Sequence, residues 1–416
     1  MTPDVVPASV IVVSQGRPEA LGRCLAGVMQ QDHPEMEIVA VTDAVGRAAV
    51  ARTGMGQWIK LVPFDAANIS LARNAGLAAA AGRVVAFIDD DAVPEPSWLR
   101  RLTAPLAEGR AVAAGGFVRG RNGISFQWRA RRVDRTGRAS ALATDPARPT
   151  LHSPPPDHAI KTEGTNMAFD RATLMAMGGF DHAFRFFLDE TDLNMRLSAA
   201  GMLTAIVPFA QVHHGFAPSA RRRRDRAPRD LFDIGASSAT FLRKHAPNDL
   251  HAPALERLRH DERRRVLGHM VAGGLEPRDV RRLMRSLEDG IAEGALRRIG
   301  ETPPLIDEER PFLAMPLAGP RPGRILAGWP WQRRGLQRAA RTAVRRGAVV
   351  TVFRFSPTTL FHHMRFHPEG YWEQTGGLFG RAEREGPLLR AAGTGTRLAE
   401  EMRRIAALRP VDTMVT

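Results

Sequence analysis

Three consecutive acids, Asp89, Asp90 and Asp91, are the residues whose types and spacing most clearly suggest chemistry. They follow residues 83–88, an apolar run typical of a buried parallel strand. Carboxylates at the carboxyl end of such a strand lie at the rim of the sheet, where open α/β folds bind ligands. Mg²⁺ and Mn²⁺ take oxygen ligands and share them with phosphates. The run therefore predicts either a divalent-cation site for a phosphorylated ligand or an acidic turn.

A second acidic pair, Asp189 and Glu190, begins a helix expected to extend to about residue 200. A carboxylate at this position can satisfy the free N–H groups of the first helical turn. It can also accept a proton from a reacting hydroxyl group. Both interpretations remain open from these two residues alone.

The elements around these acids alternate between strands and helices. Strands are expected at 9–14, 36–41, 58–62, 83–88, 111–118 and 203–207, and helices at 18–31, 70–81, 97–106, 171–178 and 190–200. This alternation predicts an α/β fold with a parallel sheet covered by helices on both faces. Residues 119–160 are rich in Arg, Gly and Pro, and we expect a long loop that closes over the site.

Several short motifs occur in one order along this half of the chain. They are Asp43 after the strand at 36–41, residues 68–76 (Asn-Ile-Ser-Leu-Ala-Arg-Asn-Ala-Gly), the acids at 89–91, residues 164–168, 178–181 and 187–193 with Arg196, and the histidines at 213–214. The series resembles the family 2 glycosyltransferases, which have the Rossmann-like GT-A nucleotide-sugar-binding fold. The resemblance covers about residues 8–216 and is specific because seven motifs share one order.

The resemblance implies a donor site that contains Ser14, Asp43, Arg73 and Asp89. Asp43 would contact the nucleotide base or its surroundings, Arg73 would lie near the nucleotide, and Asp89 would approach the ribose. The residues also allow plainer roles, since Asp43 can begin a turn and Arg73 can be a solvated charge on an Ala-rich helix.

The resemblance also implies a divalent cation, Mg²⁺ or Mn²⁺, on the donor diphosphate. Asp91 would bind this cation with Asp89 nearby, and a histidine after the last strand would complete the site. The spacing of the motif favours His214 over His213, and we expect the other histidine to be structural.

In the family, the catalytic base is the second acid of a pair that precedes a helix, so Glu190 takes that position. The usual order is Glu-Asp, and this chain has the two acids exchanged, which keeps Asp189 as the alternative base. One base without a second nucleophile implies a single displacement with inversion at the anomeric carbon.

Composition separates the two halves of the chain. The 416 residues carry a net charge of +15, of which residues 1–216 hold about +1 and residues 217–416 about +14. The excess is almost entirely arginine, and the run Arg221–Arg224 predicts peripheral, reversible contact with an anionic membrane. The single cysteine, Cys24, excludes an intrachain disulfide. The sequence lacks a long apolar run and a basic n-region, so we expect a cytoplasmic protein at the inner face of the membrane.

These observations predict four segments. They are a GT-A glycosyltransferase domain at 1–216, a basic helical extension at 217–301, a Pro-rich linker at 302–322, and a small α/β segment of unknown role at 323–416. We expect an inverting hexosyl- or deoxyhexosyltransferase of polysaccharide biosynthesis, with a nucleoside-diphosphate sugar donor and a glycan or lipid-linked acceptor. The alternatives are a catalytically silent GT-A scaffold and a basic nucleic-acid-binding or partner-binding protein. Nucleic acid is disfavoured because the basic excess avoids the half with the acidic motifs.

Overall fold

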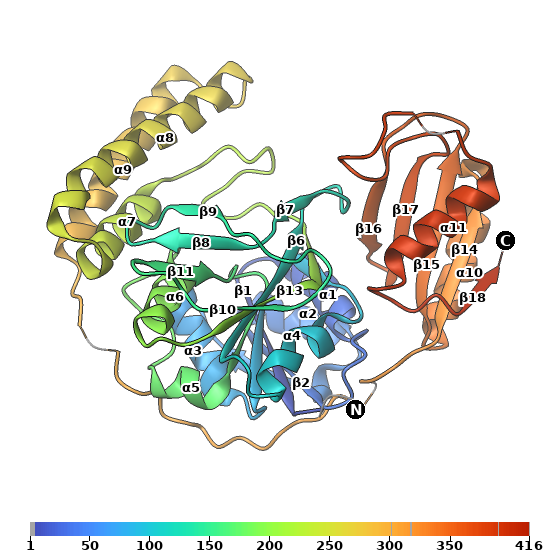
Figure 1. Ribbon diagram of the computed structural model, residues 1–416, viewed down its shortest axis with the longest axis horizontal. Helices are drawn as coiled ribbons and strands as arrows, with labels where there is room; N and C mark the ends of the chain where they lie inside the picture. The colour runs from blue at the N-terminus through green and yellow to red at the C-terminus, as the bar shows by residue number, and fades with distance from the viewer. Residues whose placement is uncertain (1–4, 301, 317, 390, 416) are drawn as a thin grey trace.

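A ten-stranded mixed sheet organises the first half of the chain (Figure 1). The structure is a computed structural model that describes residues 5–300, 302–316, 318–389 and 391–415. The main path of the sheet has the order β10-β13-β6-β12-β4-β1-β2-β3, with β5 paired to β13 and β7 to β6. The strands are β1 (Ala8–Ser14), β2 (Met36–Thr42), β3 (Ile59–Pro63), β4 (Val84–Asp89), β5 (Ala92–Pro94), β6 (Ala113–Arg119), β7 (Phe126–Trp128), β10 (Thr150–His152), β12 (Met167–Asp170) and β13 (Thr204–His214).

Helices cover both faces of this sheet, as the alternating pattern predicted. They are α1 (Pro18–Val28), α2 (Ala44–Arg52), α3 (Ile69–Ala79), α4 (Trp98–Ala107), α5 (Arg171–Ala176) and α6 (Asp189–Ala199). Successive side chains of a strand point to opposite faces. Val10 and Val12 of β1 accordingly pack in one core with α1 and α4, whereas Ile11 packs in the other with α3, α5 and α6. The predicted α/β class is confirmed.

The sheet is mixed, so the expectation of a parallel sheet is wrong in part. The strands β3, β2, β1 and β4 are parallel, but β12 is antiparallel to both β4 and β6. The reversal arises because residues 120–166 join β6 to β12 without a crossover helix, which parallel neighbours would need.

Residues 119–160 are not the unstructured loop that we expected. Besides β7 and β10, they contain β8 (Arg131–Asp134), β9 (Ala139–Ala141) and most of β11 (His158–Lys161), which form a three-stranded sheet of order β11-β8-β9. These strands have three or four residues each and few apolar side chains. Their period-two signal is therefore too short to detect in the sequence.

The predicted basic helices form a group that packs beside α6. They are α7 (Phe232–His245), α8 (His251–Val271) and α9 (Pro277–Leu296). Gly290 and Gly294 of α9 let it approach α7 closely, since a Cβ at Gly294 would meet the carbonyl oxygen of Ala236. Lys244 and His245 of α7 both lie against Asp192 of α6, at 2.7 and 2.8 Å.

The Pro-rich stretch 302–322 lies along the first domain instead of hanging free. Its backbone N–H groups at Leu305 and Met315 donate to the carbonyl oxygens of Met175 and Met36, at 3.0 and 2.8 Å. The side chain of Met315 is only 3% exposed. The stretch is therefore fastened to the domain that it crosses.

A second sheet, of order β16-β17-β15-β14-β18, forms the C-terminal unit, drawn in orange and red in Figure 1. Its elements are β14 (Gly323–Gly328), α10 (Arg333–Arg345), β15 (Val349–Ser356), β16 (His363–His367), β17 (Tyr371–Gly377), α11 (Thr394–Ile405) and β18 (Thr413–Val415). Parallel strands β14 and β15 are joined by α10 in a β-α-β unit. Three short 3₁₀ turns, Gly56–Trp58, Asn248–Leu250 and Pro330–Gln332, complete the elements described. Within the described residues, every helix is too short or too polar to span a lipid bilayer.

Candidate active site

The predicted metal ligands come together at the carboxyl end of β4. One ligand atom each from Asp89, Asp91 and His214 lies within 4.8 Å of the others. The His214 Nε2 atom is 3.3 Å from Asp91 Oδ1. The antiparallel pairing of β5 with β13 places His214 opposite Ala92, which follows Asp91 directly. Two carboxylates and an imidazole form a donor set that fits a divalent cation.

Contacts on the side of the ring away from Asp91 fix the orientation of His214. Its Nδ1 atom is 3.1 Å from the Oε1 atom of Gln127, which can only accept a hydrogen bond from it. A proton on Nδ1 leaves the lone pair of Nε2 directed at the acidic cluster. The ring of Phe216 packs 4.2 Å from the imidazole. Gln127 lies in the 119–160 segment, where no motif marked it.

The pKa values of the two buried acids of the triplet, Asp90 and Asp91, are shifted in opposite directions. Burial opposes ionisation of Asp91, but the His214 contact, Arg17 and the Ala217 N–H outweigh it and lower the pKa of Asp91 to about 2. Burial dominates at Asp90 and raises its pKa to about 7, against the opposing charge of Arg17. The Asp90 Oδ2 atom accepts a hydrogen bond from Ser14 Oγ at 2.6 Å. Ser14 therefore supports the triplet through Asp90.

Asp43 occupies a structural position at the start of α2. Its Oδ1 atom accepts the N–H of Gly46 at 2.8 Å, and its Oδ2 atom accepts the N–H of Gly16 at 2.7 Å. These are the bonds of a helix N-cap that also fastens the turn after β1. The side chain remains part-exposed, and its predicted contact with a nucleotide base stays a prediction.

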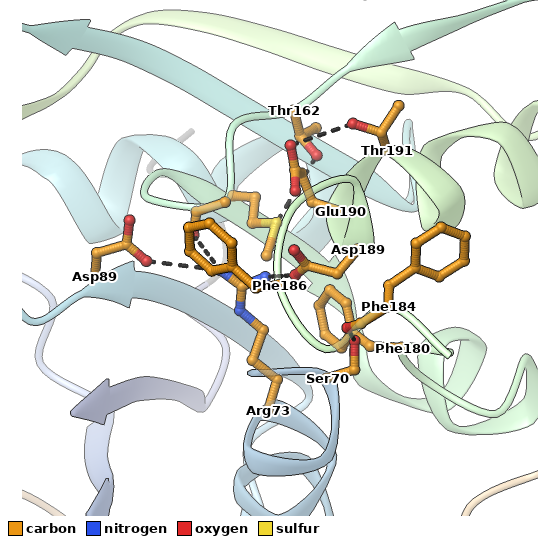
Figure 2. Close-up of polar contacts among 12 residues, drawn as sticks. Ser70, Arg73, Asp89, Thr162, Phe180, Phe184, Phe186, Asp189, Glu190 and Thr191 are labelled. Carbon is orange, nitrogen blue, oxygen red and sulfur yellow. Dashed lines mark hydrogen bonds and ion pairs between the residues drawn. The ribbon is translucent and has the colours of Figure 1, made fainter. Parts of the chain in front are cut away.

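Arg73 links the two acidic clusters. From α3 its guanidinium reaches both Asp89, at 3.6 Å, and Asp189, to which Nη1 donates (Figure 2). Nη2 donates to the carbonyl oxygen of Gly164 at 3.2 Å, and the guanidinium carbon lies 5.2 Å from the ring centre of Phe180. Arg73 is 5% exposed, so the alternative of a solvated helix charge is wrong.

The acidic pair at the start of α6 is held by two different cations. Asp189 contacts Arg73, whereas Glu190 Oε1 accepts from Lys161 Nζ at 2.6 Å. Burial raises the pKa of Asp189 to about 7 despite the charge of Arg73. Burial also opposes ionisation of Glu190, but Lys161 outweighs it and lowers the pKa to about 2. The two preceding residues, 187 and 188, have positive φ angles of 70° and 64°, a strained turn that sets the direction of the pair.

Glu190 keeps one carboxylate oxygen available. Both of its side-chain contacts, from Lys161 and from the Thr191 hydroxyl, are made to Oε1. The side chain of Glu190 is 16% exposed, against 6% for Asp189. Glu190 can therefore accept a proton on Oε2 while Lys161 holds its orientation.

Arginines from two parts of the chain surround the acid triplet. Arg17, just before α1, is 2.5 Å from Asp90 and 3.6 Å from Asp91. Arg222 lies over the ring of Phe216, at 5.4 Å, and donates to the Ala217 carbonyl. Burial lowers the pKa of the Arg222 guanidinium, and Asp91 is near enough to oppose this effect.

The four arginines of the run 221–224 differ in their surroundings, since Arg221 and Arg222 are part-buried whereas Arg223 and Arg224 are exposed. Arg221 is 2.6 Å from Asp233, and Arg223 is 3.1 Å from Asp225. Arg222 is part-buried over the ring of Phe216 and lies near enough to Asp91 for their charges to interact. Four consecutive arginines give no sequence pattern from which the different contacts of Arg221, Arg222 and Arg223 could be predicted.

A protein-family model matches part of the region that carries this site. Residues 9–177 match the model of Glycosyl transferase family 2. The predicted resemblance to family 2 glycosyltransferases is thus confirmed for this region. The matched region, residues 9–177, contains the acid triplet and Arg73, while Asp189, Glu190 and His214 lie beyond its end. The family match and the mixed α/β sheet confirm the GT-A fold class of the first half.

Two curated glycosyltransferases match shorter stretches. The chain is 31% identical over 114 residues to Glycosyltransferase GlyA of Streptococcus pneumoniae serotype 4, covering 26% of this chain and 16% of that protein. It is 36% identical over 99 residues to an uncharacterized glycosyltransferase of Nostoc sp., covering 23% and 31% respectively. The chain thus spans less than a third of the length of either relative.

Solved structures with related folds share little sequence with the chain. GalNAc-T7 with UDP, GalNAc and Mn²⁺ is 15% identical with a TM-score of 0.44, covering 58% of this chain and 48% of that one. The mannosyltransferase PcManGT from Pyrobaculum calidifontis with GDP-Man and Mn²⁺ is 18% identical with a TM-score of 0.42, covering 70% and 88%. These scores are too low to indicate a function.

Proposed function

We propose that this chain transfers a sugar from a nucleoside-diphosphate donor to a hydroxyl group of a glycan or lipid-linked acceptor. The observation that carries the proposal is the cluster of Asp89, Asp91 and His214 on one side of Arg73, with Asp189 and Glu190 on the other. A site for a phosphate-bound cation thus lies next to a candidate proton acceptor, in a chain with a family 2 glycosyltransferase region.

Departure of the nucleoside diphosphate requires positive charge near the breaking bond. A divalent cation held by Asp89, Asp91 and His214 would neutralise the charge that develops on the diphosphate. Besides Arg17, Arg222 is an arginine whose charge interacts with that of Asp91, and its planar guanidinium suits bidentate contact with a phosphate. We assign Arg222 to the diphosphate.

Removal of the acceptor proton is the second requirement. We assign it to Glu190, because its Oε2 atom is available and Lys161 keeps the carboxylate ionised at neutral pH. Asp189 then holds Arg73 in place between the two clusters. With Glu190 as the only assigned base and Asp189 paired with Arg73, we propose one displacement with inversion at the anomeric carbon.

The finer features of the protein remain proposals. The division into four segments, a hexosyl or deoxyhexosyl donor, and a role in polysaccharide biosynthesis rest on the sequence alone. Contact of the enzyme with an anionic membrane from the cytoplasmic side also remains a proposal. Internal partners reduce the free charge of the run 221–224 on which that contact was predicted.

The experiment that tests the function measures release of nucleoside diphosphate from a panel of nucleotide sugars, with and without MnCl₂. Metal-dependent release from one donor is the expected result. Release from none of the donors, together with failure to bind UDP or GDP, would instead favour the silent GT-A scaffold. Retention on nucleic acid without nucleotide binding would favour the basic binding protein.

A further inference from the structure

The C-terminal unit contacts the first domain beside the candidate metal site, through a closed group of four buried side chains. Arg409 follows α11 and forms two bonds to Glu95, Nε to Oε2 at 2.9 Å and Nη2 to Oε1 at 2.5 Å. Both side chains are 1% exposed. Glu95 directly follows β5, the short strand that begins one residue after Asp91.

Two aromatic contacts close the group. The Arg409 guanidinium lies 3.9 Å from the ring centre of Trp372 on β17, and Trp372 packs 4.8 Å from the ring of His213. His213 in turn lies with Nε2 2.7 Å from Glu95 Oε1. Each of the two domains thus contributes two members. Loss of Arg409 or Glu95 would leave an uncompensated buried charge in this group.

Strand geometry connects this group to the metal ligands. In the pairing of β5 with β13, His213 lies opposite Val93 and His214 opposite Ala92. Successive side chains of a strand point to opposite faces. His213 therefore faces the C-terminal unit, while His214 faces Asp91. The N–H of Gly215 also donates to the Asp91 carbonyl at 2.7 Å, which closes the strand pair at the ligand end.

We propose that Arg409 is a positioning residue for the metal site, and that docking of the C-terminal unit is coupled to binding of the divalent cation. Arg409 holds Glu95 in place, and together with Trp372 it also holds His213. These contacts set the spacing between β5, which begins directly after Asp91, and β13, which ends at His214. The inference rests on the proposed metal-dependent function. The proposal gives residues 323–416 a role. This unit lies outside the region of the family match and supports the metal site through Glu95 and His213.

Coupling of this kind is reciprocal. If docking strengthens metal binding by some factor, metal binding strengthens docking by the same factor. Two independent measurements on the full chain therefore test the proposal. Neither requires knowledge of the sugar or the acceptor.

The first measurement is Mn²⁺ affinity, determined from the free Mn²⁺ signal in electron paramagnetic resonance. Arg409→Met should weaken Mn²⁺ binding about 10-fold or more, the range found when residues behind metal ligands are changed. Arg409→Lys should fall between Met and the parent, since it keeps the charge and loses the two-pronged contact. The matched control is Gln30→Met. Gln30 donates to the Gly370 carbonyl across the same interface at 2.6 Å, in a bond that involves neither Glu95 nor His213. This control should leave Mn²⁺ affinity unchanged.

The second measurement is hydrogen exchange of the unmodified protein, with and without MnCl₂ and UDP. Saturation should slow exchange in β17 and in residues 408–412 about 10-fold, although these segments lie outside the metal site. Slowing confined to the ends of β4 and β13 would overturn the proposal, as would equal Mn²⁺ affinity of Arg409→Met and the parent. Absence of Mn²⁺ binding by the parent is a different result, since it would overturn the proposed function itself.

Discussion

Lys161 donates to Oε1 of Glu190 at 2.6 Å, and this contact separates the roles of two neighbouring acids. It holds the pKa of Glu190 at about 2, whereas burial raises that of the adjacent Asp189 to about 7. The acids are consecutive in sequence, yet one contacts a lysine of β11 and the other an arginine of α3. Because α6 begins at this point, the two side chains diverge toward different parts of the site.

Replacement of Glu190 by Gln should lower kcat by about 10²–10⁴, the usual effect of removing a general base. Binding of the nucleoside diphosphate should change little, because Glu190 contacts neither the acid triplet nor Arg222. Steady-state kinetics and nucleotide titration measure the two effects. The matched variant is Asp189→Asn, and a larger fall in kcat there would assign the base to Asp189.

The pH profile of kcat distinguishes the same two acids without mutation. A base must be ionised to act, so a base with a raised pKa loses activity as the pH falls through that pKa. If Asp189 were the base, kcat would fall about tenfold per pH unit below about 7. With Glu190 as the base, kcat should show no such tenfold fall per pH unit between about pH 5 and 7, because the pKa of Glu190 lies well below this range.

Removal of one carboxylate from the metal site should abolish most activity. Asp91→Asn keeps the shape of the side chain and removes its charge, and the cation contributes several kcal/mol to the transition state. We expect kcat to fall by orders of magnitude in the variant and in the parent treated with chelator. The control Asp307→Asn, which alters an exposed ion pair with Arg171, should retain parental activity. Full activity in excess chelator would contradict a metal-dependent mechanism.

The residues whose proximity the sequence predicted are those carried by short motifs. Asp89, Asp91 and His214 come together because each ends or follows a strand of one sheet. The apolar pattern placed the two acids at a strand end, whereas His214 was expected there only from the resemblance to the family. Lys161 and Arg409 carry no such signal. Each is a single charge in a segment of weak periodicity, and its partner lies 29 or 314 positions away in the chain. Only the tertiary packing reveals what such a charge contacts.

The same limit explains the error in the sheet. The apolar runs at 9–14 and 83–88 are long enough to predict central parallel strands, and both are found. The direction of β12 depends instead on how residues 120–166 return to the sheet. Their short polar strands leave no periodic pattern from which that path could be predicted.

Arg222→Met should weaken binding of a nucleoside diphosphate about 10-fold or more, because a hydrogen bond to a charged group contributes ~1.5–3 kcal/mol. Isothermal titration with UDP and GDP in MnCl₂ measures the change. Arg224→Met is the matched control, since Arg224 belongs to the same run and is exposed. Equal losses in the two variants would show that the run acts through its total charge instead of through Arg222.

Gln127 offers a test of the metal site that leaves every proposed ligand in place. It accepts from Nδ1 of His214 and so keeps the lone pair of Nε2 directed at Asp91. Gln127→Leu removes the acceptor, so the ring can rotate or change its tautomer, and Mn²⁺ affinity should fall about 10–100-fold. Gln127→Glu keeps an acceptor at the same position and should bind Mn²⁺ at least as tightly as the parent, because a carboxylate makes the imidazole a stronger donor to the metal. If both variants bind Mn²⁺ like the parent, His214 does not contribute to the site. If both lose affinity equally, the effect lies in the packing around Gln127 and not in its hydrogen bond.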